Sequence, residues 1–239
     1  MVPRIVGMSS IQLLGDAIDG QLYVMDVISR KFRRFDPKTK RTHTLSDLPT
    51  RRVNGTVVAA DGKLYVIGGY SGDVTAKNCV EVYDPKTNRW STGPSLPGYR
   101  PLDHFHAAAV LDGKLHVVGG LLDGNKGQPH WRLDGDRWTK CAESPLHTMW
   151  KHVALVATAG KLYLFAPHPV SPKNQSIEVE NNIHAYDPKT DRWEPLGRTP
   201  EGMPIVGFAQ AVAGEKIYIL GGAGSKAVRV FNTRTNAWE

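Results

Sequence analysis

The chain has 239 residues, of which 41% are hydrophobic and 22% are charged, with a formal net charge of +7. A chain of this length and apolar content can bury a substantial core, which excludes an intrinsically disordered protein and a disulfide-stapled mini-protein. No segment reaches the roughly 18 uninterrupted apolar residues that a membrane helix needs. The first residues also lack the basic and apolar regions of a signal peptide. We therefore expect no membrane association and a cytoplasmic location.

The two cysteines, Cys79 and Cys141, lie far apart in the chain, and neither has a second Cys or His at ligand spacing. A paired framework of cysteines or a zinc motif would show regular short spacings. We interpret both residues as buried free thiols and expect no disulfide, no bound metal and no cofactor.

An internal repeat organises the chain. A small residue or Asp, then Gly, a polar residue and an apolar–aromatic–apolar run recur, with the matched Leu or Ile at positions 22, 64, 115, 162 and 217. A second motif follows each copy, most completely as Tyr-Asp-Pro-Lys-Thr-Asn-Arg-Trp over residues 83–90. Self-similarity at such a period indicates a repeat architecture.

Each repeat is predicted to contain four short antiparallel strands, a to d. In the second repeat, an Asp-Gly pair suits a two-residue hairpin turn, and a Gly-Gly pair ends strand b where neighbouring backbones approach closely. The predicted strands of this repeat are Thr56–Ala60, Leu64–Ile67, Cys79–Tyr83 and a short one at Arg89–Trp90. Four such strands in each repeat, with no amphipathic helical stretch, predict an all-β propeller.

These motifs resemble the kelch repeat, in which a Gly-Gly pair precedes Tyr-Asp-Pro and a Trp follows seven positions after the Tyr. The resemblance covers about residues 8–238 and implies a β-propeller of kelch repeats with five four-stranded antiparallel blades in a single domain, residues 1–239. The expected blades are residues 8–48, 49–97, 98–146, 147–199 and 200–239. The resemblance also places the motif aromatics in the core between blades, namely Tyr83, Trp90, Tyr186, Trp193 and Trp238. Closure stays open between a five-bladed ring and part of a six-bladed propeller.

The positive charge is concentrated in the first blade and its exit. Residues 30–52 contain nine basic and two acidic residues, so their net charge of +7 equals that of the whole chain. Only Phe32 and Phe35 could stack on bases there, which does not favour nucleic-acid binding. The simplest interpretation is a solvated outer blade whose charges prevent edge-to-edge pairing. An acidic protein partner is the alternative.

Loop length distinguishes the two ends of the blades. The a–b and c–d turns are short and uniform, whereas the b–c loops and the d–a connections vary, and the longest insertion runs over residues 168–182. Variable loops on a rigid scaffold commonly carry function, so the b–c and d–a loop face is the predicted binding face. Its basic and aromatic rim suits an acidic peptide or an anionic small molecule. The candidate binding residues are Arg51, Arg52, Tyr70, Tyr99, Arg100, His104, Trp150, Lys151, His152 and His168.

No catalytic set is evident, because the chain lacks Gly-x-Ser-x-Gly and the phosphate-cradling Gly-x-x-x-x-Gly-Lys-Ser/Thr motif. His104 and His106 share a strand face, but no acidic residue or Cys is placed beside them, so no metal site is predicted. We therefore expect a noncatalytic, monomeric protein-interaction module that binds an acidic peptide segment of a protein partner. In kelch-like substrate adaptors an Arg at the position of Arg52 often binds acidic side chains.

The alternative function is a small-molecule enzyme. It would be similar to the kelch-type sialic acid mutarotases, in which basic and acidic residues at the channel mouth hold an anionic sugar. The candidates for proton transfer would be Asp103, His104, Arg100 and His152.

Overall fold

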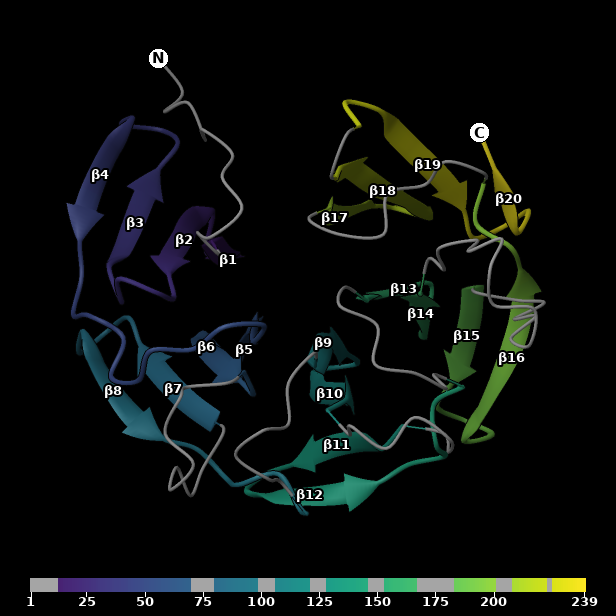
Figure 1. Ribbon diagram of the computed structural model, residues 1–239, viewed down its shortest axis with the longest axis horizontal. Coiled ribbons are helices and arrows are strands. Elements are labelled where there is room, and N and C mark those ends of the chain that lie inside the picture. Colours follow the sequence, from purple (N-terminus) through teal and green to yellow (C-terminus); the bar gives the residue numbers. More distant parts are fainter. Residues whose placement is uncertain are drawn as a thin grey trace, which may run out of the picture. The chain divides into compact units, whose positions relative to one another are not determined.

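The computed structural model describes residues 13–69, 80–98, 106–120, 128–145, 153–166, 183–200, 208–222 and 225–239. Over these residues the strands form five four-stranded antiparallel sheets, and each sheet contains four consecutive strands in chain order (Figure 1). The predicted all-β class with five four-stranded blades is thereby confirmed. Among the described residues there is no long apolar helix of the kind that crosses a membrane.

The chain divides into two compact units, Met1–Leu102 and Asp103–Glu239. The first unit contains blades 1 and 2. Their strands are β1 (Leu13–Ile18), β2 (Gln21–Asp26), β3 (Phe32–Asp36), β4 (Arg41–Thr44), β5 (Thr56–Ala60), β6 (Lys63–Ile67), β7 (Val80–Asp84) and β8 (Arg89–Thr92). The predicted strands of blade 2 correspond to β5–β8, although Cys79 lies outside the described residues.

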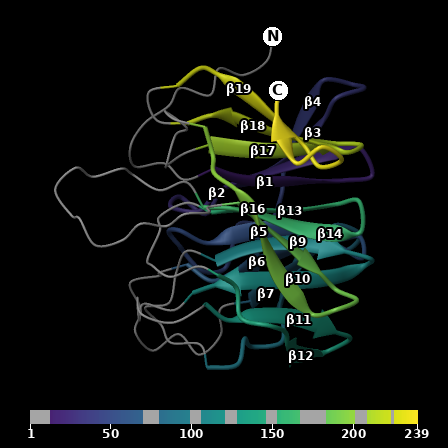
Figure 2. The same cartoon turned by 90° about the vertical axis from the view of Figure 1, so that its right-hand side faces the viewer.

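The second unit contains blades 3, 4 and 5. Figure 2 shows the four strands of blade 3 following one another from β9 to β12. The strands of this unit are β9 (His106–Leu111), β10 (Lys114–Gly119), β11 (His130–Asp134), β12 (Arg137–Lys140), β13 (Ala154–Thr158), β14 (Lys161–Phe165), β15 (Ile183–Asp187), β16 (Arg192–Gly197), β17 (Phe208–Ala213), β18 (Lys216–Gly221), β19 (Val228–Asn232) and β20 (Ala237–Trp238). The single domain expected from the sequence stays a prediction. The closure of the ring, with five blades or as part of six, also stays open.

The a–b turns explain why Asp-Gly recurs in the sequence. A type I′ hairpin turn needs a positive φ at both central residues, which Gly adopts freely and Asp tolerates. Asp61 and Gly62 have φ angles of 49° and 69°. The corresponding pairs of blades 1, 3 and 4 also have positive φ angles, namely Asp19-Gly20, Asp112-Gly113 and Ala159-Gly160. Local turn chemistry therefore sets the register of strands a and b in these blades.

The c–d turns are built around an Asx turn. The Oδ1 atom of Asp84 accepts a hydrogen bond from the Lys86 amide at 2.8 Å, and Asp187 does the same for Lys189 at 2.9 Å. Such side-chain acceptors replace a backbone turn bond and make the Asp of Tyr-Asp-Pro a turn residue. The c–d turns of blades 1, 2, 4 and 5 thus have a common hydrogen-bonding basis. Blade 3 differs, because its turn is shorter and the Asp134 carboxylate accepts from the side chains of Arg132 and Thr139.

Successive blades within the first unit are joined by an aromatic cluster. Tyr83 of blade 2 is almost fully buried and meets Phe32 of blade 1 edge to face, with ring centroids 4.7 Å apart. Its hydroxyl donates to Asn88 Oδ1 at 2.9 Å, and the indole nitrogen of Trp90 donates to the Ser46 carbonyl at 2.9 Å. The expected core position of Tyr83 is confirmed, and Trp90 is half-buried and packs against the same cluster.

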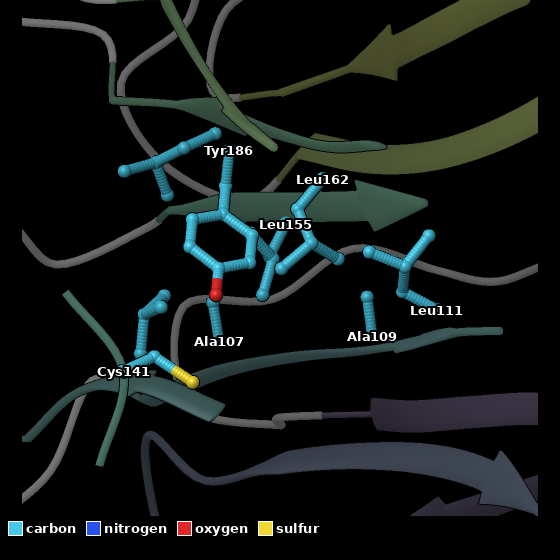
Figure 3. Close-up of a cluster of buried hydrophobic side chains, with 9 residues drawn as sticks. Ala107, Ala109, Leu111, Cys141, Leu155, Leu162 and Tyr186 are labelled. Atoms are coloured by element: carbon cyan, nitrogen blue, oxygen red, sulfur yellow. The ribbon is translucent and has the colours of Figure 1, made fainter. Parts of the chain in front are cut away.

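The second unit repeats this arrangement. Tyr186 is buried among Leu155, Leu162 and Ala107, and Figure 3 shows its hydroxyl directed toward Cys141. Trp193 donates from its indole nitrogen to the Ala142 carbonyl at 3.2 Å. Between blades 4 and 5, the corresponding Trp238 packs on Phe165 and Phe231. The motif aromatics therefore pack between blades, as the sequence led us to expect.

The core of each unit lies at the junctions between consecutive blades. In the first unit, aliphatic and aromatic side chains of blades 1 and 2 form one buried cluster. In the second unit, one cluster joins blades 3 and 4 and another joins blades 4 and 5.

The Gly-Gly pair should be required for close backbone approach rather than for its φ angle alone. A Cβ added to Gly69 (φ 86°) would lie 2.9 Å from the Val53 carbonyl oxygen, whereas one added to Gly62 (φ 69°) would meet nothing within 4 Å. We expect Gly69→Ala to lower the free energy of unfolding by roughly 2–4 kcal/mol and Gly62→Ala by about 1 kcal/mol. Urea denaturation of both variants tests this, and equal losses would contradict the close-approach explanation.

Tyr83 should make stability sensitive to alkaline pH. Burial raises the pKa of its phenol to about 12, against 10.0 for an unperturbed Tyr. A group whose folded-state pKa is raised stabilises fully below its unfolded pKa, and the contribution is lost as the pH rises through the folded pKa. We expect Tyr83→Phe to cost about 1 kcal/mol at neutral pH through the lost hydrogen bond. The variant should also lose less stability than the parent between pH 10 and 12, as urea midpoints measured across this window would show.

Candidate ligand-binding face

Of the candidate binding residues, Arg51 and Arg52 lie in the described part of the chain. The others fall outside the described residues, namely Tyr70, Tyr99, Arg100, His104, Trp150, Lys151, His152 and His168. Asp103, a proton-transfer candidate for the enzyme alternative, also falls outside them. The roles of all these residues stay predictions.

Arg52 lies inside the first unit rather than on its surface, with a relative exposure of 3%. Its Nε and Nη2 atoms each lie 3.0 Å from Glu81 Oε2, and its Nη1 donates to the Gly68 carbonyl at 2.8 Å. Because Glu81 neutralises the guanidinium at short range, Arg52 does not offer its charge to a ligand as an exposed Arg would. This arrangement fits a positioning role for Arg52.

The Arg52 ion pair ties together the segments that carry the predicted binding loops. Arg52 belongs to the d–a connection between β4 and β5, Gly68 follows β6 at the start of the b–c loop, and Glu81 belongs to strand c, β7. Thr50 adds a hydroxyl donor to Glu81 Oε1 at 2.6 Å. The d–a connection and the base of the b–c loop of blade 2 therefore meet at one end of the blade, as expected for a loop face.

Arg51 is exposed immediately beside this buried pair. Its neighbour's side chain enters the unit while its own remains in solvent, so the two arginines that look equivalent in the sequence differ in availability. Arg51 is therefore the described candidate whose charge a ligand at this end of blade 2 can contact.

The other basic residues of the 30–52 segment are mainly solvated. The exposed cations include Arg33 on β3 and Arg41 on β4, and Lys31 pairs with Asp47 at 2.8 Å on the surface. This exposure agrees with the interpretation of a charged outer blade, and it leaves the same cations accessible to an acidic partner.

His106, which the sequence paired with His104, begins β9 and is buried. A Cβ added to Gly120 would overlap the His106 imidazole ring. The Gly pair at the end of β10 therefore makes room for this ring, which gives His106 a packing role.

His116, His130 and Cys141 form a buried cluster that the sequence did not indicate. These buried residues come from β10, from β11 and from the residue after β12, and their ligand atoms all lie within 4.8 Å of one another. The Nδ1 atom of His116 is 2.9 Å from Nε2 of His130. Short-range ligand spacing could not reveal the cluster, because adjacent strands bring the three residues together. Alignment of the repeats could have done so, since His116 replaces the Tyr that the other repeats carry.

Burial controls the charge of this cluster. It lowers the pKa of His116 to about 3, with a further contribution from His130, and it lowers the pKa of His130 to about 4. Burial also raises the pKa of the Cys141 thiol. At neutral pH the cluster therefore contains two neutral imidazoles and a protonated thiol.

Comparison with known proteins identifies the repeat. A family model for the Kelch motif matches residues 51–97. The chain is 29% identical to Kelch-like protein 25 of Xenopus tropicalis, over 92% of this chain and 37% of that protein. It is 41% identical to Kelch-like protein 33 of Homo sapiens, over 40% of this chain and 17% of that protein. The chain thus spans less than two fifths of the length of these relatives.

The solved structure of YjhT matches the fold. It superposes with a TM-score of 0.70 over 95% of this chain and 83% of that chain, at 18% sequence identity. At this identity the match establishes the fold alone.

Removing one partner of the buried Arg52–Glu81 pair should destabilise the protein much more than replacing both partners. We expect Glu81→Leu to destabilise the protein by roughly 3–5 kcal/mol, because it leaves the Arg52 guanidinium buried without its counter-charge. The double variant Arg52→Met/Glu81→Leu should recover much of this loss. Asp47→Asn, which breaks the exposed pair with Lys31, is the matched control and should cost less than about 1 kcal/mol. Urea denaturation of the three variants distinguishes these outcomes, and a double variant as unstable as Glu81→Leu would contradict the asymmetry.

Proposed function

The chain belongs to the kelch-repeat β-propeller family, and we propose that it is a noncatalytic module that binds an acidic peptide segment of a protein partner through its b–c and d–a loop face. Propellers of this family commonly serve protein interaction. Because the chain spans a minor part of its relatives' length, the proposal concerns the blades and not a whole protein.

The observation that carries the proposal is the buried ion pair that holds the loop end of blade 2 in place. The buried pair of Arg52 and Glu81 joins the d–a connection to the base of the b–c loop. A loop held on such a base loses less conformational freedom when it orders against a ligand. The exposed Arg51 lies next to this base and supplies an unneutralised guanidinium.

The charge balance favours an acidic ligand. Residues 30–52 carry a net charge of +7. Glu81 neutralises the Arg52 part of it, and the remaining cations add a long-range attraction to the charge of Arg51. Charge complementarity of this kind speeds encounter, while a charge-assisted hydrogen bond to a carboxylate supplies specificity. An extended peptide can present several carboxylates to such a surface, which a single small anion cannot.

The structure does not describe the residues on which the enzyme alternative depends, namely Asp103, His104, Arg100 and His152. Binding of an anionic sugar would distinguish it from the peptide-binding module.

The test is a titration with fluorescent Asp- and Glu-rich peptides, with Asn- and Gln-substituted peptides of the same length, and with N-acetylneuraminate as the anionic sugar. We expect the acidic peptides to bind, and Arg51→Ala and Arg100→Ala to weaken binding roughly tenfold each, the effect of about 1.4 kcal/mol. Arg41→Ala, an exposed arginine of β4, is the matched control.

The controls separate a specific contact from general attraction. Arg41→Ala should change the affinity less than Arg51→Ala, because it removes the same charge from an outer strand. Equal effects of the two substitutions, or equal binding of acidic and amide peptides, would contradict the proposed face. Binding of the sugar without binding of the acidic peptides would favour the enzyme alternative.

A further inference from the structure

The blade 1–2 junction and the blade 3–4 junction correspond ring for ring in their internal geometry. In the first, Phe32 lies 4.7 Å from Tyr83 at an interplanar angle of 88°. In the second, His130 lies 4.5 Å from Tyr186 at 83°. His130 therefore occupies the place of Phe32.

The other ring positions correspond in the same way. Tyr23 lies 6.2 Å from Tyr83 at an interplanar angle of 57°, and His116 lies 5.9 Å from Tyr186 at the same angle. His116 thus occupies the place of Tyr23. These rings pack on a Tyr–Trp pair in both junctions, Tyr83 with Trp90 in the first and Tyr186 with Trp193 in the second.

A backbone hydrogen bond identifies a third pair of matched positions. The Leu45 amide donates to the Phe32 carbonyl at 3.0 Å, as the Cys141 amide donates to the His130 carbonyl at 2.9 Å. Cys141 therefore occupies the place of Leu45.

Asn88 and Asp191 are the last matched pair. Asn88 Oδ1 accepts from the Tyr83 hydroxyl and the Ser46 amide, and Asp191 Oδ1 accepts from the Tyr186 hydroxyl and the Ala142 amide. The backbone and the Tyr–Trp pair of the junction are thus repeated within the chain. The four matched positions carry Tyr23, Phe32, Leu45 and Asn88 in the first junction. They carry His116, His130, Cys141 and Asp191 in the second.

A packing role alone does not account for this set of changes. The blade 1–2 junction shows that the same frame is filled by apolar and aromatic side chains, which bury without the cost of desolvating two imidazoles and a thiol. Each changed position gains a side chain that binds transition metals, and three of them place their donor atoms within 4.8 Å of one another. Imidazole and thiolate together are the donor set that zinc prefers.

We propose that His116, His130 and Cys141 form a buried binding site for Zn²⁺ at the junction of blades 3 and 4. This site is distinct from the loop face and does not rest on the proposed function. The ligands come from β10, from β11 and from the residue after β12, so the ion would cross-link consecutive strands of blade 3.

The geometry needs only small adjustments. In a tetrahedral site with Zn–N of about 2.0–2.1 Å and Zn–S of about 2.3 Å, two nitrogens lie roughly 3.3 Å apart and a nitrogen and a sulfur roughly 3.6 Å apart. The two imidazole nitrogens are 2.9 Å apart, and every donor pair lies within 4.8 Å. The two nitrogens would therefore separate by roughly 0.4 Å, and no nitrogen–sulfur pair would close by more than about 1.2 Å. Zinc sites with three protein ligands complete their coordination with a water or another small ligand.

Charge compensation for the ion would come from two groups. Binding would replace the thiol proton of Cys141 with the ion, so one thiolate would offset part of the ion's charge. The Asp191 carboxylate, which interacts electrostatically with His130 and Cys141, supplies a second negative charge. The Arg132 guanidinium interacts with all three donors and opposes this compensation in part.

The burial of the donors dictates how the experiment is done. His116 and His130 are 1% and 0% exposed, so an ion would enter as the blades pack rather than through an open mouth. The protein should therefore be made without a histidine tag, unfolded in reductant and chelator, and refolded with or without one equivalent of Zn²⁺. We expect about one Zn²⁺ per chain by elemental analysis and a higher thermal unfolding midpoint for the zinc-refolded protein.

The variants copy the residues of the blade 1–2 junction. His116→Tyr/His130→Phe and Cys141→Leu keep the packing frame and remove the donors, so both should lose the bound zinc and the zinc-dependent rise in the midpoint. His43→Ala, which removes an exposed histidine from β4, is the control and should bind zinc like the parent.

Refolding of the unmutated protein with Co²⁺ provides a second measurement. A thiolate-to-cobalt charge-transfer band in the near ultraviolet is expected from Cys141. The band should persist in Cys79→Ser, which removes the other cysteine of the chain. Absence of bound zinc in the parent, absence of the thiolate band, or retention of zinc by both donor-deleted variants would overturn the proposal.

Discussion

The contact between the motif Tyr–Trp pair of one blade and the aromatic face of the preceding blade is the interaction on which each unit depends. A four-stranded sheet cannot bury both of its faces alone, so every blade needs a neighbour. Tyr83 and Trp90 supply this cover for blade 1, and each is anchored by a hydrogen bond that sets its orientation. The directed contacts, together with buried area, make one blade pack on the next in a defined register.

Because that frame is held by the Tyr, the Trp and backbone carbonyls, the remaining junction positions are free to change. Phe32 and His130 occupy the same place against their Tyr partners at nearly the same distance and angle. A repeat fold can therefore place different chemistry at equivalent positions without altering the backbone. This freedom separates the buried cluster of blade 3 from the apolar junction of blade 1.

The positions of Arg51 and Arg52 could be predicted from the sequence, but their exposure could not. Position in the repeat located Arg51 and Arg52 at the loop end of blade 2, and the structure places both in the d–a connection there. Their exposure could not be read from the repeat, because it depends on Glu81, which is 29 residues further along the chain than Arg52. The ion pair forms only when β7 is placed beside that connection.

The sequence by itself determined the blades, because their signals are local. The positive φ angles at Asp61 and Gly62, the alternation along each strand and the spacing of the motif Tyr and Trp all act within one repeat. The tertiary structure alone decided which side chains meet, since pairing of adjacent strands joins residues that are distant in the chain. His116 and His130 are 14 residues apart, and hydrogen-bonded strands bring their ring nitrogens to 2.9 Å.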